Sequence, residues 1–321
     1  MRPDPASEAK GSGRIHEAAA HGNRVRLCGH SSRAPAHLQG GIRGPRMNLS
    51  LEGKVAIVTG GSGGIGRGLV GCLAQEGCRV VIATRDAAVG AAVAEEASEG
   101  AGEASLQVTD VTDRDAVSSL VEETTARLGS VDILVNNAGG TPGPSSFHEA
   151  SLDAIQAEID LNVWGVIHCT RAVLPGMVER GGGSIIQITS NSGLQAEAAN
   201  MVATYGGAKG YVTALSRALA FEYGPSGVRI NCIAPGWIVP WDPSHTGEGS
   251  FWNRYGYELF GSPDEMEAAA KTGRLFNVES QRIRRIGRPE DIGHLACFLA
   301  SDLSSYITGQ TISVGGGAYM P

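Results

Sequence analysis

Apolar runs alternate with segments of helical periodicity along most of the chain, beginning at Lys54. The runs are short, rich in β-branched residues and nearly continuous in apolar character, which is typical of strands covered on both faces. Strands are predicted at residues 55–59, 79–83, 104–108, 133–135, 184–189, 228–233 and 311–314. Helices are predicted between them, at about residues 65–76, 87–99, 113–128, 151–180, 203–223 and 289–300.

This alternation predicts an α/β fold. Strands that alternate with helices form a doubly wound parallel sheet, here of about seven strands, with right-handed crossovers and helices on both faces. The sequence contains no internal repeat and no signature of a second domain. We therefore expect residues 47–321 to form one domain.

The segment 203–223 carries a pair of polar residues at the edge of an apolar stripe. The stripe consists of Ala208, Val212, Leu215 and Leu219. At about 100° per residue, Tyr205 and Lys209 lie together at its flank. We expect the pair at the rim of the core, where reactive side chains can meet a cleft.

Composition limits the classes of protein that the chain can belong to. Of its 321 residues 42% are apolar and 18% charged, as in a soluble globular protein. The six Cys show no CxxC spacing, which favours free thiols in the cytoplasm and predicts no metal site. No apolar run approaches the roughly 18 residues that span a bilayer. The net charge of −7 gives no electrostatic case for nucleic acid.

The first 46 residues differ from the rest. They carry eight Arg and Lys against three acidic residues, a charge of +5, which leaves −12 for the remainder. They are rich in Gly, Ala, Ser and Pro, and they lack the apolar run of a signal peptide. We expect residues 1–46 to be a disordered extension. Ordered patterning begins close to Met47, a candidate for the true start of the protein.

Tyr205 and Lys209 are four residues apart, on one face of a helix. A Lys charge beside a phenol favours the phenolate and is expected to lower the Tyr pKa from about 10 toward neutrality. A phenol tuned in this way exchanges a proton with an alcohol or a carbonyl. That exchange is half of a hydride-transfer reaction.

A glycine-rich turn follows the first predicted strand and opens a helix near Ile65. Two registers are possible: Gly61, Gly63 and Gly66 match GxGxxG, whereas Gly60, Gly64 and Gly66 match GxxxGxG. Glycines in this position allow a pyrophosphate to approach the backbone at a helix N-terminus. The context of strand, turn and helix predicts a dinucleotide site.

The end of the second predicted strand bears on the choice of dinucleotide. An acidic residue there binds the ribose 2′-hydroxyl of NAD, whereas Arg accommodates the 2′-phosphate of NADP. Thr84 takes the acidic position and Arg85 follows, which favours NADP(H) over NAD(H). The alternative is a solvated Arg85 with Asp86 on the ribose.

With these motifs the chain resembles the short-chain dehydrogenase/reductase family, from about Lys54 to Gly317. The motifs occur in order: the glycine turn at residues 59–66, Asp110-Val111, Asn136-Asn137-Ala138-Gly139, Asn162, Ser190, Tyr205 with Lys209, and Pro235-Gly236. The resemblance implies a single-domain Rossmann-type fold and NAD(P)-dependent oxidoreductase activity on CH–OH or C=O groups. It also implies a homotetramer or homodimer.

The resemblance assigns a role to each matching residue. Tyr205 would be the general acid/base, and Lys209 would bind the nicotinamide ribose and lower the Tyr205 pKa. Asn162 would hold a water that links Lys209 to bulk solvent, and Asp110 would hydrogen-bond the adenine. The full set of implied cofactor contacts is Gly60, Ser62, Gly64, Ile65, Gly66, Thr84, Arg85, Asp110, Val111, Asn137, Ala138, Gly139, Tyr205, Lys209, Pro235, Gly236 and Ile238.

A Ser hydroxyl would hold the substrate oxygen, and two are candidates. The strand register favours Ser190, which lies 15 residues before Tyr205. Ser192 lies 13 residues before Tyr205, at the family's usual separation. We take Ser190 as the catalytic residue and Ser192 as a substrate contact, with their exchange as the alternative.

Aromatic residues gather where the family has its substrate loop. Eight of the chain's 17 aromatics lie between residues 237 and 276, in a lid expected at about residues 237–285. A capping box at Ser262 and Glu265, Pro263 and a terminating Gly273 predict a short helix within it. Trp237 and Trp241 are the predicted substrate contacts, which favours an apolar or alicyclic substrate. The alternative is that the aromatics form the lid's own core or a subunit contact.

The predicted function is NADP(H)-dependent hydride transfer between nicotinamide and a carbonyl or secondary alcohol. One alternative is a 3-oxoacyl-thioester reductase, for which Arg282, Arg284, Arg285 and Arg288 could seed a basic docking surface. Others are an NAD-dependent alcohol dehydrogenase and a C=C reductase. A non-enzymatic cofactor-sensing protein is disfavoured because no catalytic position is missing.

Overall fold

The computed structural model describes residues 48–246, 250–272 and 282–320. The extension expected at residues 1–46 lies outside the described residues, as do Met47, Gly273 and Phe276. Within the described part of the chain, no helix is both long and apolar enough to cross a membrane.

The described strands form one parallel sheet of seven strands in the order β3-β2-β1-β4-β5-β6-β7. Their bounds are β1 Val55–Thr59, β2 Arg79–Thr84, β3 Glu103–Val108, β4 Ile133–Asn136, β5 Gly183–Ile188, β6 Val228–Pro235 and β7 Thr311–Val314. Strands β1 to β3 follow one another toward one edge of the sheet, and strands β4 to β7 follow one another toward the other edge. The direction in which successive strands are added therefore reverses between β1 and β4. The predicted α/β fold is confirmed. Ligands of such sheets bind at the carboxyl ends of the strands beside this reversal.

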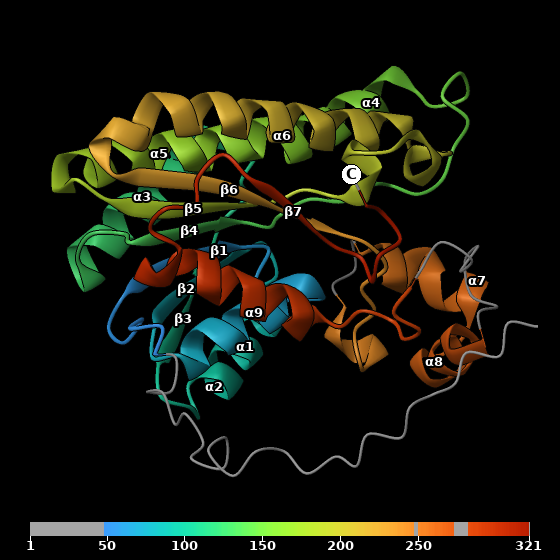
Figure 1. Cartoon of the computed structure of the whole chain (residues 1–321), viewed down its shortest axis with the longest axis horizontal. Coiled ribbons are helices and arrows are strands. Elements are labelled where there is room, and N and C mark those ends of the chain that lie inside the picture. Colours follow the sequence, from blue (N-terminus) through green and yellow to red (C-terminus); the bar gives the residue numbers. More distant parts are fainter. Residues whose placement is uncertain (1–47, 247–249, 273–281, 321) are drawn as a thin grey trace, which may run out of the picture. The chain divides into compact units, whose positions relative to one another are not determined.

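Helices cover both faces of the sheet (Figure 1). Helices α1, α2 and α9 pack on one face, and α3, α5 and α6 pack on the other. Their bounds are α1 Ile65–Gln75, α2 Ala87–Ala97, α3 Arg114–Leu128, α5 Gly165–Arg180, α6 Ala203–Tyr223 and α9 Pro289–Ala300. Each face buries its own cluster of aliphatic side chains, because both surfaces of the central strands are apolar.

The prediction of a single helix at residues 151–180 is wrong in one respect. The structure divides it into α4 Leu152–Ile159, a π-helical turn Asp160–Trp164 and α5 Gly165–Arg180. The Asn162 amide inside the turn donates to the carbonyl of Glu158 four residues earlier. This side chain competes with the backbone ladder and widens the turn.

The described part of the lid contains a 3-10 turn Pro243–His245, a π-helical turn Trp252–Gly256 that continues into α7 Tyr257–Phe260, and helix α8 Pro263–Thr272. The capping box predicted for α8 is present, because the Ser262 amide donates to Glu265 at 2.8 Å and the Glu265 amide donates to the Ser262 hydroxyl at 3.3 Å. A small core of Val239, Met266, Ala270 and Ile286 lies beneath these helices. The lid is therefore packed on itself as well as on the sheet.

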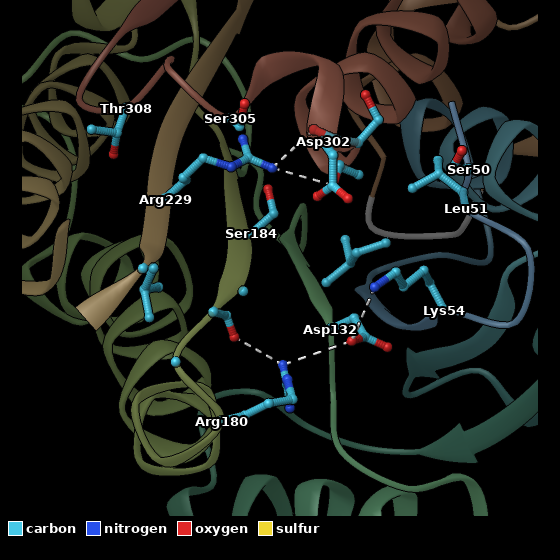
Figure 2. A pocket seen from close by; sticks show the side chains of 18 of the residues that line it. Ser50, Leu51, Lys54, Asp132, Arg180, Ser184, Arg229, Asp302, Ser305 and Thr308 are labelled. Atoms are coloured by element: carbon cyan, nitrogen blue, oxygen red, sulfur yellow. Dashed lines mark hydrogen bonds and ion pairs between the residues drawn. The ribbon is translucent and has the colours of Figure 1, made fainter. Parts of the chain in front are cut away.

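A polar pocket of about 380 Å³ lies at the amino ends of the strands (Figure 2). Arg180 and Lys54 point toward Asp132 in this pocket, at 3.8 and 3.9 Å. Arg229 donates to carbonyls at the end of α9, including that of Leu299 at 2.7 Å. Because these cations already have partners, the pocket braces the amino edge of the sheet, opposite the edge where ligands bind.

Candidate active site

Helix α6 carries Tyr205 and Lys209 to the carboxyl edge of the sheet. Tyr205 is half-buried at the rim, as predicted, but Lys209 is only 3% exposed and lies deeper than the sequence indicated. Its ammonium donates to the carbonyl of Ile188, at the end of β5, at 3.0 Å. That bond draws the side chain under the sheet edge, and the ammonium lies 5.5 Å from the centre of the Tyr205 ring.

The two candidate Ser hydroxyls have different partners. Ser190 lies two residues after the end of β5, and its hydroxyl accepts from the Ser192 amide at 3.1 Å. The Ser192 hydroxyl instead donates to the carbonyl of Ala198 at 2.6 Å, within the same loop. Of the two hydroxyls, that of Ser190 keeps its proton for another partner, and its choice as the catalytic residue stays a prediction.

The acidity of Tyr205 differs from the expectation. Burial raises the pKa of Tyr205 to about 12, the hydrogen bond with Ser190 acts in the opposite direction, and the negative charge of Glu158 adds to the increase. Burial also lowers the pKa of Lys209 to about 8. The ammonium lies over the ring and donates to Ile188, so it gives the phenolate oxygen no direct partner in this geometry.

Asn162 is fully buried, and its amide is held by backbone groups. It donates to the carbonyls of Gly140 at 2.7 Å and Glu158 at 2.9 Å, and it accepts from the Gly140 amide at 3.0 Å. These bonds tie α4 to the loop after β4. Both amide protons are used in this way, so the side chain holds the site together. Its predicted water-binding role stays a prediction.

The site contains an acid that the sequence interpretation missed. Glu158 is 8% exposed and lies one helical turn before Asn162. Burial raises the pKa of its carboxyl, and a hydrogen bond from the Thr141 hydroxyl acts to lower that pKa. The spacing of four residues from Asn162 could have indicated it, because such residues share a helix face.

The glycine turn fits a dinucleotide. Gly60 and Gly64 have positive φ angles of 62° and 52°, which glycine adopts without strain. A Cβ at Gly66 would lie 2.0 Å from the Gly60 carbonyl oxygen, so only glycine lets the turn close on α1. The turn thus lies at the N-terminus of α1, where helix amides favour a phosphate group. The Gly64 amide donates to the carbonyl of His245 in the lid at 2.8 Å.

The segment after β4 clamps this turn. Asn137 donates from its side chain to the carbonyls of Thr59 and Gly60 at 2.9 and 3.0 Å. The Asn137 and Ala138 amides both donate to the Thr59 hydroxyl at 3.0 Å. Gly139 allows the close approach of Asn162 and Lys209, because a Cβ there would lie 2.7 and 2.8 Å from their polar atoms. The segment thus joins the glycine turn to Asn162 and Lys209.

The end of β2 presents no free carboxylate. Thr84 is buried, and its hydroxyl lies 2.8 Å from the Ser62 hydroxyl of the glycine turn. Asp86 caps α2, where its carboxylate accepts from the Val89 amide at 3.0 Å. Arg85 is exposed and lies 3.7 Å from Asp110. Burial acts to raise the Asp110 pKa, but hydrogen bonds from Thr112 and the Arg85 charge keep that pKa below its usual value.

The remaining predicted cofactor contacts have varied surroundings. Val111 and Ile238 are buried in the two core clusters, one on each face of the sheet. Pro235 ends β6, and Gly236 packs so closely on Gly315 that a Cβ at Gly236 would lie 2.7 Å from the Gly315 Cα. Ile65 begins α1 behind the glycine turn. Ile238 thus contributes packing, and its predicted contact with the cofactor stays a prediction.

The two predicted substrate Trp residues have different partners. Trp237 is 37% exposed, and its ring packs against Phe260, Trp252 and Phe251 at centroid distances of 5.5 to 6.4 Å. The Arg288 guanidinium lies 3.4 Å from the centre of the Trp241 ring. The Trp237 ring therefore lies in an aromatic cluster of the lid, whereas Trp241 is 62% exposed. The substrate contacts predicted for both residues stay predictions.

The fold and the site define a nucleotide-dependent oxidoreductase. A family model described as short chain dehydrogenase matches residues 54–240, and one described as enoyl-(acyl carrier protein) reductase matches residues 264–319. The chain belongs to the short-chain dehydrogenase/reductase family, as the resemblance indicated. It is an NAD(P)-dependent oxidoreductase.

Individual relatives cover nearly all of the described chain. L-fucose dehydrogenase of Bos taurus is 38% identical, with 85% of this chain and 92% of the relative covered. The 7alpha-hydroxysteroid dehydrogenase of Escherichia coli (strain K12) is 34% identical, with 84% and 96% covered. A solved structure of a 7 alpha-hydroxysteroid dehydrogenase complexed with NADH and 7-oxo glycochenodeoxycholic acid has a TM-score of 0.71 at 32% identity, with 84% and 96% covered.

Proposed function

We propose that the chain catalyses NADP(H)-linked interconversion of a ketone and a secondary alcohol, with Tyr205 as the general acid/base. The observation that carries this proposal is the buried Lys209 ammonium, 5.5 Å from the centre of the Tyr205 ring, with Ser190 two residues beyond the end of β5. When bound, the nicotinamide supplies or accepts the hydride. Ser190 orients the substrate oxygen, and Tyr205 gives the proton in reduction and takes it in oxidation.

The preference for NADP(H) is supported by the end of β2. Asp86 is the nearby acid that could bind a ribose hydroxyl, and its carboxylate already caps α2. Arg85 is exposed and held only at 3.7 Å from Asp110, so its guanidinium can turn to a 2′-phosphate. The related 7 alpha-hydroxysteroid dehydrogenase was solved in complex with NADH, which supports the opposite choice. A test of the proposal therefore needs both cofactors.

An apolar or alicyclic substrate is supported by the lid. Its aromatic core includes Trp237, which stays partly exposed beside the catalytic edge. The name of one relative indicates that its substrate is a hydroxysteroid, which is a rigid alicyclic alcohol. The name of another relative indicates a sugar, L-fucose, which would favour a polar site.

A 3-oxoacyl-thioester reductase is the second candidate. A relative named 3-oxoacyl-[acyl-carrier-protein] reductase, from Chlamydia muridarum, supports it, at 36% identity with 84% of this chain and 99% of the relative covered. The enoyl reductase description of the model that matches residues 264–319 instead supports a C=C reductase. Two of the four Arg residues proposed for carrier docking are already engaged. Arg285 forms two bonds with Asp291 at 2.7 and 2.8 Å, and Arg288 is buried and donates to the Val239 carbonyl at 3.2 Å. This arrangement favours the ketone reductase.

A cofactor-paired screen tests these choices. The purified full chain is assayed for NADPH and NADH consumption with cyclohexanone-type ketones, sugars in the oxidative direction and a 3-oxoacyl thioester. The proposal expects the highest kcat/KM with NADPH and a cyclic ketone. Equal kcat/KM for ketones and sugars would refute the substrate class, and a preference for NADH would refute the cofactor choice.

We further propose a cytoplasmic homotetramer or homodimer. Apolar rings on the π-helical turn and α6 support an interface, because Trp164, Tyr211 and Phe221 are exposed in the single chain. Free buried thiols, such as those of Cys72 and Cys169, are compatible with a reducing compartment. Light scattering of the purified protein measures its mass in solution, and the mass of a single subunit would refute the oligomer proposal.

A further inference from the structure

The lid contacts the loop after β4 through Tyr255. This residue belongs to the π-helical turn Trp252–Gly256, and its ring lies against Gly143 in that loop. A Cβ at Gly143 would lie 2.7 Å from a ring carbon of Tyr255, closer than the 3.0 Å that real Cβ contacts keep. The ring therefore closes on this loop only because residue 143 has no side chain.

Two further rings lead from Tyr255 to the loop after β6. The centroid of the Phe251 ring lies 6.3 Å from that of Tyr255 and 6.4 Å from that of Trp237. Both distances lie within the range of packed aromatic pairs. Trp237 lies two residues after the end of β6. We call Tyr255, Phe251 and Trp237 together the aromatic row.

The aromatic row crosses the edge of the sheet that holds Lys209. It leads from the loop after β4 to the loop after β6, and β5 lies between these two strands in the sheet. Neighbouring strands are about 4.8 Å apart, so the row has about 10 Å to cross, a distance that two ring-to-ring steps cover. The end of β5 carries Ile188, whose carbonyl accepts from the Lys209 ammonium.

The loop after β4 is held on its other side by the segment before α6. The Ser145 amide donates to the carbonyl of Met201, four residues before Tyr205, at 2.7 Å. The contact with Tyr255 is of a different kind, because no described residue forms a hydrogen bond with the Tyr255 hydroxyl. Of these two contacts, the one between Tyr255 and Gly143 therefore opens without the loss of a hydrogen bond.

We infer that Tyr255 is a specificity-determining residue, whose ring closes the substrate cleft against Gly143 and limits the substrate to a single-ring ketone or the corresponding alcohol. This inference rests on the proposed function and narrows its substrate class. A compact ring leaves the contact intact. A ketone that extends past Gly143 must displace the phenol, which exposes apolar surface of the ring to water.

The test compares cyclohexanone with 1-decalone, which carries one additional fused ring beside the carbonyl. The NADPH-dependent kcat/KM is measured for each ketone, and the ratio of 1-decalone to cyclohexanone is the readout. The wild type should prefer cyclohexanone. Tyr255→Ala removes the ring that 1-decalone has to displace, so its ratio should rise about tenfold or more. A loss that affects both ketones equally cancels in this ratio.

Two variants serve as controls. Tyr255→Phe keeps the ring and lacks only the hydroxyl, so it should restore the wild-type ratio to within about twofold. Tyr306→Ala removes a fully exposed ring next to Ser305, which lines the pocket at the amino ends of the strands. Its ratio should coincide with that of the wild type, because this position is remote from the lid.

Thermal unfolding tests the contact without turnover. Gly143→Ala adds a methyl group that collides with the Tyr255 ring, and it also strains a backbone with a φ of 134°. This strain is the same with and without the ring, so a double-mutant cycle with Tyr255→Ala removes it from the comparison. Gly143→Ala should lower the Tm of the wild type by about 2 °C or more beyond its effect in Tyr255→Ala.

The outcomes distinguish the inference from the proposed function. Turnover of both ketones with the same ratio in the wild type and in Tyr255→Ala would overturn the inference and leave the proposed function standing. A Tyr255→Phe ratio like that of Tyr255→Ala, or equal Tm losses in the two backgrounds, would also overturn it. Turnover of neither ketone would refute the proposed substrate class and the inference with it.

Discussion

Replacing Gly66 by Ala tests the geometry of the glycine turn. A Cβ at this position would lie 2.0 Å from the Gly60 carbonyl oxygen and 2.8 Å from the Asn137 side-chain nitrogen. Contacts to a real Cβ stay above 3.0 Å, so the Gly60 carbonyl must move by about 1 Å. That movement breaks the bond in which Asn137 donates to Gly60 at 3.0 Å.

The expected cost follows from these contacts. Overpacking costs about 1–3 kcal/mol and the lost hydrogen bond about 1 kcal/mol, while Ala in a helix returns about 0.5–1 kcal/mol. The net loss of about 1–3.5 kcal/mol lowers the Tm by about 2–6 °C for a chain of this size. The displaced turn should also weaken NADPH binding by about tenfold or more.

The control lies in the same helix. A Cβ at Gly71 would have no atom within 4 Å. Gly71→Ala should therefore gain about 0.5–1 kcal/mol from helix propensity and leave NADPH binding unchanged. Thermal unfolding and fluorescence titration with NADPH measure both variants. If Gly66→Ala matches Gly71→Ala in both measurements, the proposed role of the glycine turn is refuted.

Four further variants test the site. Arg85→Ala should lower kcat/KM with NADPH by about tenfold or more and leave NADH unaffected, whereas an equal loss with both would refute the 2′-phosphate role. Ser190→Ala should lower kcat by about a hundredfold and Ser192→Ala by much less; the reverse order would exchange their roles. Asn162→Ala removes three buried hydrogen bonds and should cost about 2–4 kcal/mol in thermal unfolding, so an unchanged Tm would contradict its bracing role.

The sequence predicted most of the sheet because both faces of its strands are buried. Each of the seven strands lies within two residues of its predicted bounds. A continuous apolar run is a local property of the sequence, and it predicts a strand whichever helix packs against the sheet. The order of the strands then follows from the chirality of the crossovers.

Other features depend on contacts between distant residues, and the sequence did not reveal them. The break at Asn162 depends on bonds to Gly140, 22 residues away. The depth of Lys209 depends on the Ile188 carbonyl, at the end of another strand. Periodicity along α6 favoured Leu215 and Leu219 as core residues, but Ser216 and Ala220 are the buried ones, so the core face is rotated.

Aromatic content in the lid was also ambiguous in the sequence. An aromatic residue contributes the same large apolar surface to a small core as to a substrate site. The packing of Trp237 on Phe260 and of Trp241 on Arg288 became visible only in the structure. The helix cap at Ser262, by contrast, is a short-range pattern, and the structure confirmed it.

The central claim is that the Tyr205 hydroxyl transfers the proton in NADP(H)-linked carbonyl chemistry. The most direct measurement is kcat for NADPH-dependent reduction of a cyclic ketone by wild-type protein and by Tyr205→Phe, with NADPH affinity measured in parallel. Removal of the proton donor should lower kcat by about 10²- to 10⁴-fold and leave the Kd for NADPH within about twofold. A Tyr205→Phe protein with full turnover would contradict the claim.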